Sequence, residues 1–423
     1  MSAAEPPAVR RRHIAAAVAG NALEFYDFTA YTFFSIQIGR AFFPSHDPFV
    51  SLMLSLGTFG AGFLGRPLGG FLIGRYSDRQ GRRPALVLSF VLMGLGILGL
   101  GVTPSYASIG LAAPLIVIAA RIVQGIALGG QVGSATAYLL EVAPPQKRGL
   151  YTTLQYGSQG FAAILGGAVA FALAKLLNAD ELAAYGWRIA FLLGAAALPF
   201  GFVLQRGLPE TLPTQVEKSI ESFAAHARAT VLALFALGSA TIGVYTLYYL
   251  PTYAQTELHM HAAIASATGI VFGAFNLVFA MWFGAVSDRF GRRWTALWPR
   301  IATAVLAVPM FVWLYDARSG AVLLALTAIL TIFIAGSAGA NLPAIAESVP
   351  ASLRSGVLGT VYAVAIATFG GSAQVMEAWL VKATGSPFAP GWYLAAASLM
   401  GVVAIWLMPE TAPAKAKPGA GTP

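Results

Sequence analysis

The stretch GRYSDRQGRR at residues 74–83 returns later in the chain as GAVSDRFGRR at residues 284–293. Both copies combine two glycines with one aspartate and several arginines, which suits a tight, charged turn between two helices. Two further sets of landmarks recur in the same order. They are Glu141, Pro144, Arg148 and Gly149 with the counterparts Glu347, Pro350, Arg354 and Gly356, and the tripeptide Pro-Glu-Thr at 209–211 and again at 409–411. The chain is therefore built from two similar halves.

Apolar segments long enough to cross a membrane surround these landmarks. Only 10% of the 423 residues are charged and 57% are hydrophobic, whereas about 25% of residues are charged in an ordinary soluble domain. A helix of about 20 apolar residues covers a hydrocarbon core of about 30 Å. Such segments lie at residues 14–39, 49–74, 84–103, 109–132, 150–176, 187–206, 229–252, 264–286, 295–315, 320–343, 357–381 and 389–408.

These segments predict an all-α membrane protein with twelve transmembrane helices in two six-helix bundles. We expect the bundles at residues 1–206 and 229–411, joined by a cytoplasmic linker at 207–228. The tail at 412–423 is rich in Pro, Gly and Lys, and we expect it to be disordered.

The basic residues predict how the chain is oriented in the membrane. Most of the 26 Lys and Arg residues fall in the terminal segments or in alternate loops, and Arg300 is assigned to the inner edge of the ninth span. The loops on the other side contain only Arg40, Lys175, Arg188, Arg318 and Lys382. This positive-inside bias predicts cytoplasmic termini and explains the net charge of +9. The expected partner is the lipid bilayer, and nucleic acid is excluded.

Several function classes lack the residues that they need. The chain has no cysteine, and its only neighbouring histidines, His259 and His261, fall in a short loop that we expect to be solvated. We therefore predict no metal site and no cofactor. The sequence contains neither a phosphate-binding glycine loop nor a recognisable set of nucleophile and base, so an enzyme is not expected.

Two similar halves favour a transporter, in which bundles rock around a central site, over a duplicated channel or structural protein. The repeated loop suggests a conformational latch, because its charges can exchange partners when helices move. The alternative is that its arginines only anchor the loop at the membrane surface. The candidate latch residues are Asp78, Arg82 and Arg83 with the counterparts Asp288, Arg292 and Arg293.

At family level, the chain resembles the major facilitator superfamily in GRYSDRQGRR, in RIVQG at 121–125 and in both Pro-Glu-Thr endings. Three further stretches, GNALEFYDFTAY at 20–31, GFLGRPLGG at 62–70 and QGIALGG at 124–130, are similar to its metabolite:proton symporter family. YTTLQYGSQG at 151–160 and NLPAIAESVP at 341–350 resemble the citrate-proton symporters of that family. The resemblance implies proton-coupled uptake of small organic acids across a bacterial inner membrane. Similar family members carry 2-oxoglutarate, shikimate, or proline and betaine.

Two acids in the first span need an explanation, since an acid at the centre of a spanning helix costs about 2.5 to 3.5 kcal/mol. In NALEFYDF at residues 21–28, Glu24 and Asp27 lie three positions apart and can share one helix face. We predict that Asp27 pairs with Arg121 of the fourth span, because each charge then supplies the other's counter-ion. Protonation of Asp27 would then free Arg121 for a substrate carboxylate, a hypothesis that rests on helix positions and on the family resemblance. Sugar-proton symporters of the superfamily are similar in pairing a first-span acid with a fourth-span arginine. Glu24 as the proton carrier and a static ion pair stay open.

Further polar residues within the spans are candidates for substrate binding. Gln155, Ser158 and Gln159 share a face of the fifth span, although they could instead bond between helices. Arg66 either lines the inner cavity or reaches the interface, and Glu377 is the clearest ionisable residue within the second half. The full set of substrate candidates is Asn21, Tyr31, Arg66, Arg121, Gln124, Gln155, Ser158, Gln159, Asn341 and Tyr362.

Together these observations predict a proton-coupled symporter, acting as a monomer, for citrate or another tricarboxylate. Arg66 and Arg121 with the amides of the fifth span could supply the several donors that a polycarboxylate needs. The first alternative is a symporter for 2-oxoglutarate, another dicarboxylate or shikimate. The alternative from another class is an uncoupled facilitator or a membrane sensor of the same ligand.

Overall fold

The computed structural model describes residues 11–80, 82–129, 143–144, 147–206, 227–348 and 361–412, and these residues are almost entirely helical, with no strand. The helices of the first half are α1 (Arg11–Phe33), α2 (Ser35–Phe42), α3 (Pro48–Gln80), α4 (Arg82–Val102), α5 (Tyr106–Ile109), α6 (Ala112–Gly129), α8 (Arg148–Leu176), α9 (Ala179–Glu181), the π-helical turn η2 (Leu182–Gly186) and α10 (Trp187–Arg206). Those of the second half are α11 (Ala227–Thr256), α12 (Ala262–Phe290), α13 (Arg292–Ala317), α14 (Gly320–Glu347), the π-helical turn η4 (Ile366–Gly370), α16 (Gly371–Thr384) and α17 (Ala389–Leu407).

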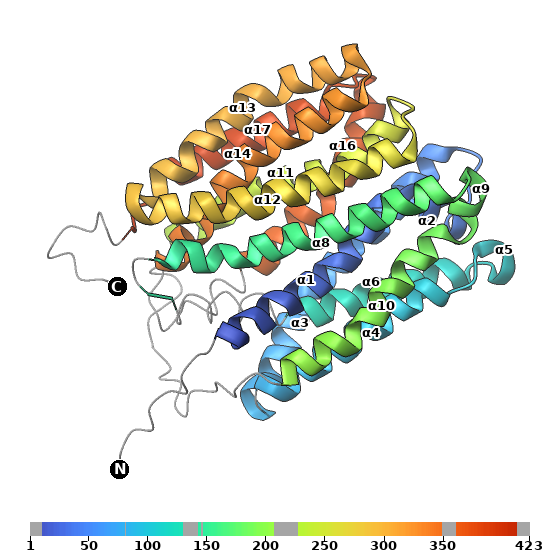
Figure 1. Ribbon diagram of the computed structural model, residues 1–423, viewed down its shortest axis with the longest axis horizontal. Helices are drawn as coiled ribbons and strands as arrows, with labels where there is room; N and C mark the ends of the chain where they lie inside the picture. The colour runs from blue at the N-terminus through green and yellow to red at the C-terminus, as the bar shows by residue number, and fades with distance from the viewer. Residues whose placement is uncertain are drawn as a thin grey trace, which may run out of the picture.

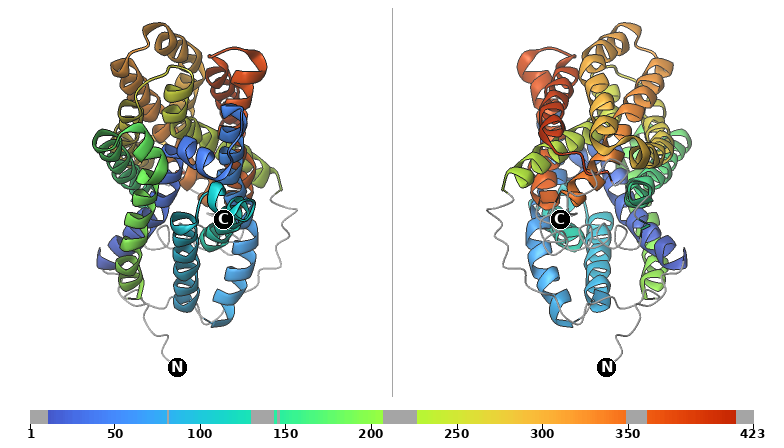
Figure 2. Two further views of the ribbon diagram at one scale, coloured as in Figure 1. Left: turned by 90° about the vertical axis from the view of Figure 1, so that its right-hand side faces the viewer. Right: turned by 90° about the vertical axis from the view of Figure 1, so that its left-hand side faces the viewer.

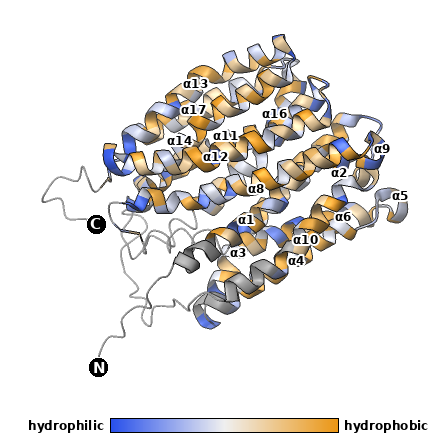
Figure 3. Ribbon diagram, viewed as in Figure 1, coloured by the Kyte–Doolittle hydropathy of each residue, from blue (hydrophilic) through white to orange (hydrophobic). Residues whose placement is uncertain are grey.

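The long helices are apolar along most of their length, as the hydropathy colours of Figure 3 show. In hydrocarbon a backbone has no water to bond with, so an apolar segment satisfies its own N–H and C=O groups by forming a helix. Among the described residues, nine helices are long and apolar enough to cross a membrane. Within the described part of the chain, each predicted span coincides with one helix or with consecutive helices, and the predicted fold class is confirmed.

Several boundaries differ from the prediction. The first span is broken at Phe34, between α1 and α2. The repeated loop is shorter than expected, because α3 and α12 continue into it and Gly74 and Gly284 lie inside helices. In the second copy the turn is made by Gly291, whose φ of 104° is one that residues with a side chain rarely adopt. The predicted linker at 207–228 overlaps the start of α11, which begins at Ala227.

The long helices form two bundles, seen from the side in Figure 1 and from both ends in Figure 2. One bundle contains α1, α3, α4, α6, α8 and α10, and the other contains α11 to α17. Helix α8 lies between α1 and α12 and forms the longest contact between the bundles. We call the end at which α1 begins and α17 ends the terminal end, and the end that holds α5 and α9 the opposite end.

Glycines allow α8 and α12 to approach until their backbones touch. A Cβ added to Gly160 would come within 2.7 Å of the carbonyl oxygen of Gly273, and one added to Gly167 within 2.8 Å of the backbone nitrogen of Ile270. Any larger side chain at Gly160 would collide with backbone that cannot rotate away. This close approach joins the two bundles along the axis of the protein.

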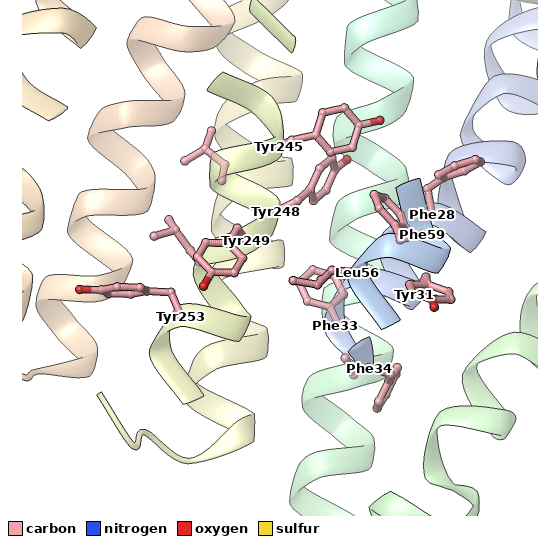
Figure 4. Packing of buried hydrophobic residues seen from close by; sticks show 14 of the residues in the cluster. Phe28, Tyr31, Phe33, Phe34, Leu56, Phe59, Tyr245, Tyr248, Tyr249 and Tyr253 are labelled. Atoms are coloured by element: carbon pink, nitrogen blue, oxygen red, sulfur yellow. The ribbon is translucent and has the colours of Figure 1, made fainter. Parts of the chain in front are cut away.

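Aromatic rings fill the space between the bundles near the centre of the molecule. Figure 4 shows Phe28 and Phe59 of the first bundle facing Tyr245 and Tyr248 of the second. The ring centroids of Phe59 and Tyr245 are 6.0 Å apart. Large apolar side chains such as Leu64, Leu111 and Trp298 are instead exposed on the outside of the bundles. That arrangement suits a protein whose outer surface meets lipid tails.

Candidate functional site

An ion pair lies at the centre of the first bundle. The Nη1 atom of Arg121 on α6 lies 2.8 Å from the Oδ2 atom of Asp27 on α1, and both side chains are fully buried. The same nitrogen donates to Oε1 of Gln124 at 2.6 Å. The guanidinium also faces the rings of Phe28 and Tyr31, at 4.8 and 4.5 Å from their centroids. The predicted partners are therefore in contact, whereas the side chain of Glu24 lies outside the described residues.

The ion pair leaves hydrogen-bonding capacity unused. Nε and Nη2 of Arg121, Oδ1 of Asp27 and Nε2 of Gln124 have no hydrogen-bond partner among the described residues. A buried donor without a partner typically costs about 1 to 3 kcal/mol. Donors on Arg121 and Gln124 are thus available to an anion that would occupy this site.

Arg66 lies inside the protein and not at its surface. Its side chain is buried on α3, and its guanidinium carbon lies 4.5 Å from the centroid of Phe63 and 5.2 Å from that of Phe28. None of its three nitrogens has a hydrogen-bond partner among the described residues. The phenol of Tyr362, from the other bundle, lies within electrostatic reach of this guanidinium. Arg66 and Tyr362 therefore face each other across the boundary between the bundles.

The fifth predicted span, α8, uses part of its polar face to hold α1. Nδ2 of Asn21 donates to Oγ of Ser158 at 2.6 Å and to the carbonyl oxygen of Gln155 at 3.2 Å. Ser158 in turn donates to the Gln155 carbonyl at 2.7 Å. Tyr31 is also engaged, since its hydroxyl donates to the carbonyl of Ser55 at 3.0 Å. Asn21, Tyr31 and Ser158 thus hold helices together in this conformation, and Gln159 is buried on the same helix as Ser158.

The side chain of Arg300, which the sequence assigned to the inner edge of the ninth span, lies inside the protein and not at its surface. The residue is fully buried on α13, where Nε donates to Oγ of Ser337 at 3.1 Å and Nη1 to the carbonyl of Ser239 at 3.2 Å. Its Nη2 atom has no partner, and the described residues pair it with no acid. The sequence did contain a signal for burial, because apolar residues flank the arginine on both sides in WTALWPRIATAV at 294–305.

Arg300 extends the polar centre into the second bundle. Asn341 lies one helical turn beyond Ser337 on α14, is buried, and has no partner in the described part for either amide atom. Tyr156 lies within electrostatic reach of both Arg300 and Tyr362. Arg66, Tyr362, Tyr156 and Arg300 thus come from both halves, and each lies within electrostatic reach of the next.

At the terminal end, the second copy of the repeated loop closes the contact between the bundles. Asp288 accepts hydrogen bonds from the backbone nitrogens of Gly149 and Leu150 at 2.9 and 3.2 Å. These groups belong to the N-terminal turn of α8, which Lys147 leaves without a side-chain cap of its own. A carboxylate at a helix N-terminus is favourable because it meets unpaired N–H groups and the positive end of the helix dipole.

Arg292 connects this cap to the rest of the second bundle. Its guanidinium lies 2.7 Å from Asp288 and 3.1 Å from Glu347. Glu410 accepts from the backbone nitrogens of Arg292 and Arg293 at 2.7 and 3.2 Å. The candidate latch residues of the second copy thus take part in one network. In the first copy, the side chains of Asp78, Arg82 and Arg83 lie outside the described residues.

A cavity of about 1120 Å³ opens at the opposite end, between the two bundles. Residues of both halves line it, among them Leu52 of α3, Tyr249 of α11 and Lys382 of α16. Leu56 and Phe59, one and two turns beyond Leu52, are buried between the cavity and Arg121. The molecule is therefore hollow at the opposite end, packed across its centre and held together at the terminal end.

Comparison with known proteins identifies the family. The model of the Major Facilitator Superfamily matches residues 18–275, and that of the sugar (and other) transporters matches residues 213–416. The chain belongs to the major facilitator superfamily. This confirms the family resemblance and makes the protein a multi-pass membrane transporter and not an enzyme.

Several relatives of this major facilitator protein carry names that state their substrates. It is 34% identical over 393 residues to the citrate-proton symporter of Salmonella typhi, covering 91% of each chain. It is also 34% identical over 402 residues to the alpha-ketoglutarate permease of Escherichia coli, covering 92% of this chain and 91% of that protein. A third relative, the proline/betaine transporter of Escherichia coli, is 31% identical over 431 residues and covers 95% and 84%.

Solved structures agree on the fold of this transporter. The xylose transporter XylE from E. coli, in a partially occluded inward open conformation, superposes with a TM-score of 0.77 at 20% identity, covering 95% and 98% of the two chains. A crystal structure of a D-xylose-proton symporter also gives a TM-score of 0.77, at 21% identity over 96% and 99%. At this identity the likeness supports the two-bundle architecture alone.

Proposed function

We propose that this transporter is a proton-coupled symporter that imports a tricarboxylate of the citrate class across a bacterial inner membrane. The observation that carries the proposal is the set of three buried guanidiniums, Arg66, Arg121 and Arg300. Of these three, only Arg121 is paired with an acid in the described part of the chain, and each has at least one nitrogen without a hydrogen-bond partner there. Buried cations require counter-charges, and an anion with several carboxylates would supply them.

Competition for Arg121 couples the proton to the anion. When Asp27 is ionised, it holds Nη1 of Arg121 at 2.8 Å and reduces the attraction of the guanidinium for another anion. When a proton neutralises Asp27, the ion pair is lost, and Arg121 binds a substrate carboxylate. Loss of the proton on the other side of the membrane restores the pair and helps to release the anion. Glu24 as the carrier stays the alternative.

Alternating access follows from the two ends of the molecule. The distribution of basic residues supports a cytoplasmic terminal end, and the cavity at the opposite end would then face outside. In this state Asp288, bonded to the start of α8, keeps the cytoplasmic end closed. Rocking of the bundles would open that end and close the cavity above the aromatic rings. We propose that a single chain carries out the whole transport cycle.

A second substrate class is supported by one observation. The identity to the alpha-ketoglutarate permease, 34%, equals the identity to the citrate-proton symporter of Salmonella typhi. A 2-oxoglutarate symporter would keep the coupling step at Asp27 and would use fewer of the cationic groups. Arg300, as an additional buried cation, favours the anion with more carboxylates.

Uptake of labelled citrate into proteoliposomes with an acidic exterior tests the proposal. We expect accumulation that a protonophore abolishes and that unlabelled citrate and tricarballylate inhibit, whereas shikimate and betaine do not. Accumulation of labelled 2-oxoglutarate without citrate uptake would keep the coupling and overturn the substrate. Equilibration of citrate without accumulation would show an uncoupled facilitator.

A further inference from the structure

A second acid is buried far from the ion pair at Asp27. Glu377 lies on α16 in the second bundle, and its side chain is fully buried. The described residues give it one hydrogen bond, between Oε1 and Oγ1 of Thr246 on α11 at 2.5 Å, and no ion pair. Its Oε2 atom has no partner among the described residues. An ionised carboxylate in this position would lack the cation that such a buried charge requires.

The hydrogen atom of Thr246 indicates which form of Glu377 fits this packing. A threonine hydroxyl has a single hydrogen to donate. Oγ1 of Thr246 also lies 2.9 Å from the carbonyl oxygen of Ile242, which can only accept. If Thr246 donates to that carbonyl, its contact with Glu377 needs a hydrogen from the carboxyl group. If Glu377 were ionised, its Oε1 atom would accept a hydrogen bond from the Thr246 hydroxyl, and Oε2 would still have no donor inside the membrane.

Glu377 is also close to a route for protons. The cavity at the opposite end, called the outer cavity below, is lined by Ala378, the next residue, and by Val381, one turn along α16. Tyr249 of α11 lines the cavity too, and its phenol lies within electrostatic reach of Glu377. The other titratable group facing the acid is Tyr393 of α17, and neither phenol is a cation. The carboxyl group thus lies close to the cavity wall, within electrostatic reach of a tyrosine that lines it.

We propose that Glu377 is a second proton-binding site, separate from Asp27, that is loaded from the outer cavity and emptied after the bundles rock. The inference rests on the proposed function, since the proton moves with the anion. On release, the O–H bond of the carboxyl group breaks and the proton passes to water on the cytoplasmic side. The carboxylate that remains needs water around it, which the present packing does not provide. Release of the proton therefore belongs to the conformation that is open at the terminal end.

The test compares Glu377→Gln, which keeps a neutral donor for Thr246, with the wild-type protein and a matched control. Glu257→Gln is the control, because Glu257 lines the same cavity but is not fully buried. Protons moved per citrate are measured in proteoliposomes, together with exchange of labelled for unlabelled citrate. We expect Glu377→Gln to move one proton fewer and to keep exchange. Its accumulation ratio would fall about tenfold for each pH unit of the gradient.

Two results would overturn the inference. One is an unchanged proton count in Glu377→Gln, and the other is loss of both uptake and exchange, which would assign Glu377 a structural role. An infrared spectrum gives a readout that does not depend on transport. At neutral pH we expect the wild-type protein to show a protonated carboxyl band that Glu377→Gln removes and Glu257→Gln retains. If the wild-type protein moves no protons, the proposed function fails. If it moves protons but lacks the carboxyl band, only the inference about Glu377 fails.

Discussion

Single side chains set the charge balance inside this transporter. Asp27 and Arg121 neutralise each other over 2.8 Å, whereas Arg66 and Arg300 are buried with no acid paired to them in the described residues. We therefore expect neutralisation of the acid to affect proton coupling and removal of an unpaired cation to affect the affinity for the substrate.

Asp27→Asn should abolish proton-driven accumulation of citrate and retain exchange of internal for external citrate. The amide resembles the protonated acid, so Arg121 stays free for the anion, but no proton can be bound or released. Both activities are measured on the same proteoliposomes, with Asp47→Asn, at the opposite end, as the control. Accumulation by Asp27→Asn equal to that of the wild-type protein would remove Asp27 from the coupling step.

Arg300→Gln should weaken the apparent affinity for citrate more than that for 2-oxoglutarate. A hydrogen bond to a charged group contributes about 1.5 to 3 kcal/mol, which corresponds to roughly 10- to 100-fold in affinity. Competition curves for both acids measure the effect, and Arg40→Gln, an exposed arginine on the cavity wall, is the control. An equal loss for both acids would show that Arg300 supports the fold and does not contact the additional carboxylate.

Among the helices, α8 contributes most to the contact between the two bundles. It bonds to α1 through Asn21 and Ser158, and to α12 through Asn276, which donates to the carbonyl of Tyr156 at 2.8 Å. Its glycines bring it against the backbone of α12. The small residues are needed because lipid tails provide no hydrophobic force to drive two apolar helices together.

Gly160→Val should lower the thermal stability of the purified protein by about 1 to 3 kcal/mol, the usual cost of overpacking. The added side chain would meet the carbonyl of Gly273 and the nitrogen of Leu277 at under 3 Å. Gly57→Val is the matched control, because nothing lies within 4 Å of a Cβ at Gly57. Thermal unfolding in detergent measures both variants, and an equal midpoint for the two would contradict the close contact between α8 and α12.

The whole molecule is asymmetric along its long axis. It is hollow at the opposite end, and at the terminal end it is held by Asp288, which bonds to the other bundle. The balance between this conformation and one open at the terminal end is sensitive to small energies, because about 1.4 kcal/mol changes a population ratio tenfold.

Asp288→Ala should shift this balance toward opening at the terminal end. Loss of a helix cap typically costs about 0.5 to 2 kcal/mol, and the ion pair with Arg292 is lost as well. The chain has no cysteine, so spin labels can be attached to cysteines introduced at Tyr151 and Arg289 without a background signal. We expect a longer distance between the labels to gain population. An unchanged distribution would show that the contact with α8 does not control the conformation.

The sequence by itself determined the fold class, the number of spans and the two related halves. Long apolar runs, the repeated loop and the placement of basic residues are local properties, and the membrane allows such segments few structures other than helices. Spacing along α1 and α6 was also enough to suggest the contact between Asp27 and Arg121. Only the tertiary structure decided which polar groups are already bonded to a neighbouring helix, as Asn21 and Ser158 are, and which, like Arg66, have nitrogens without a hydrogen-bond partner among the described residues. It also moved Arg300 from the interface to the interior and brought Glu377 to Thr246. The physical reason is that burial and hydrogen bonding depend on how helices rotate and tilt against one another, which hydropathy along one helix does not specify.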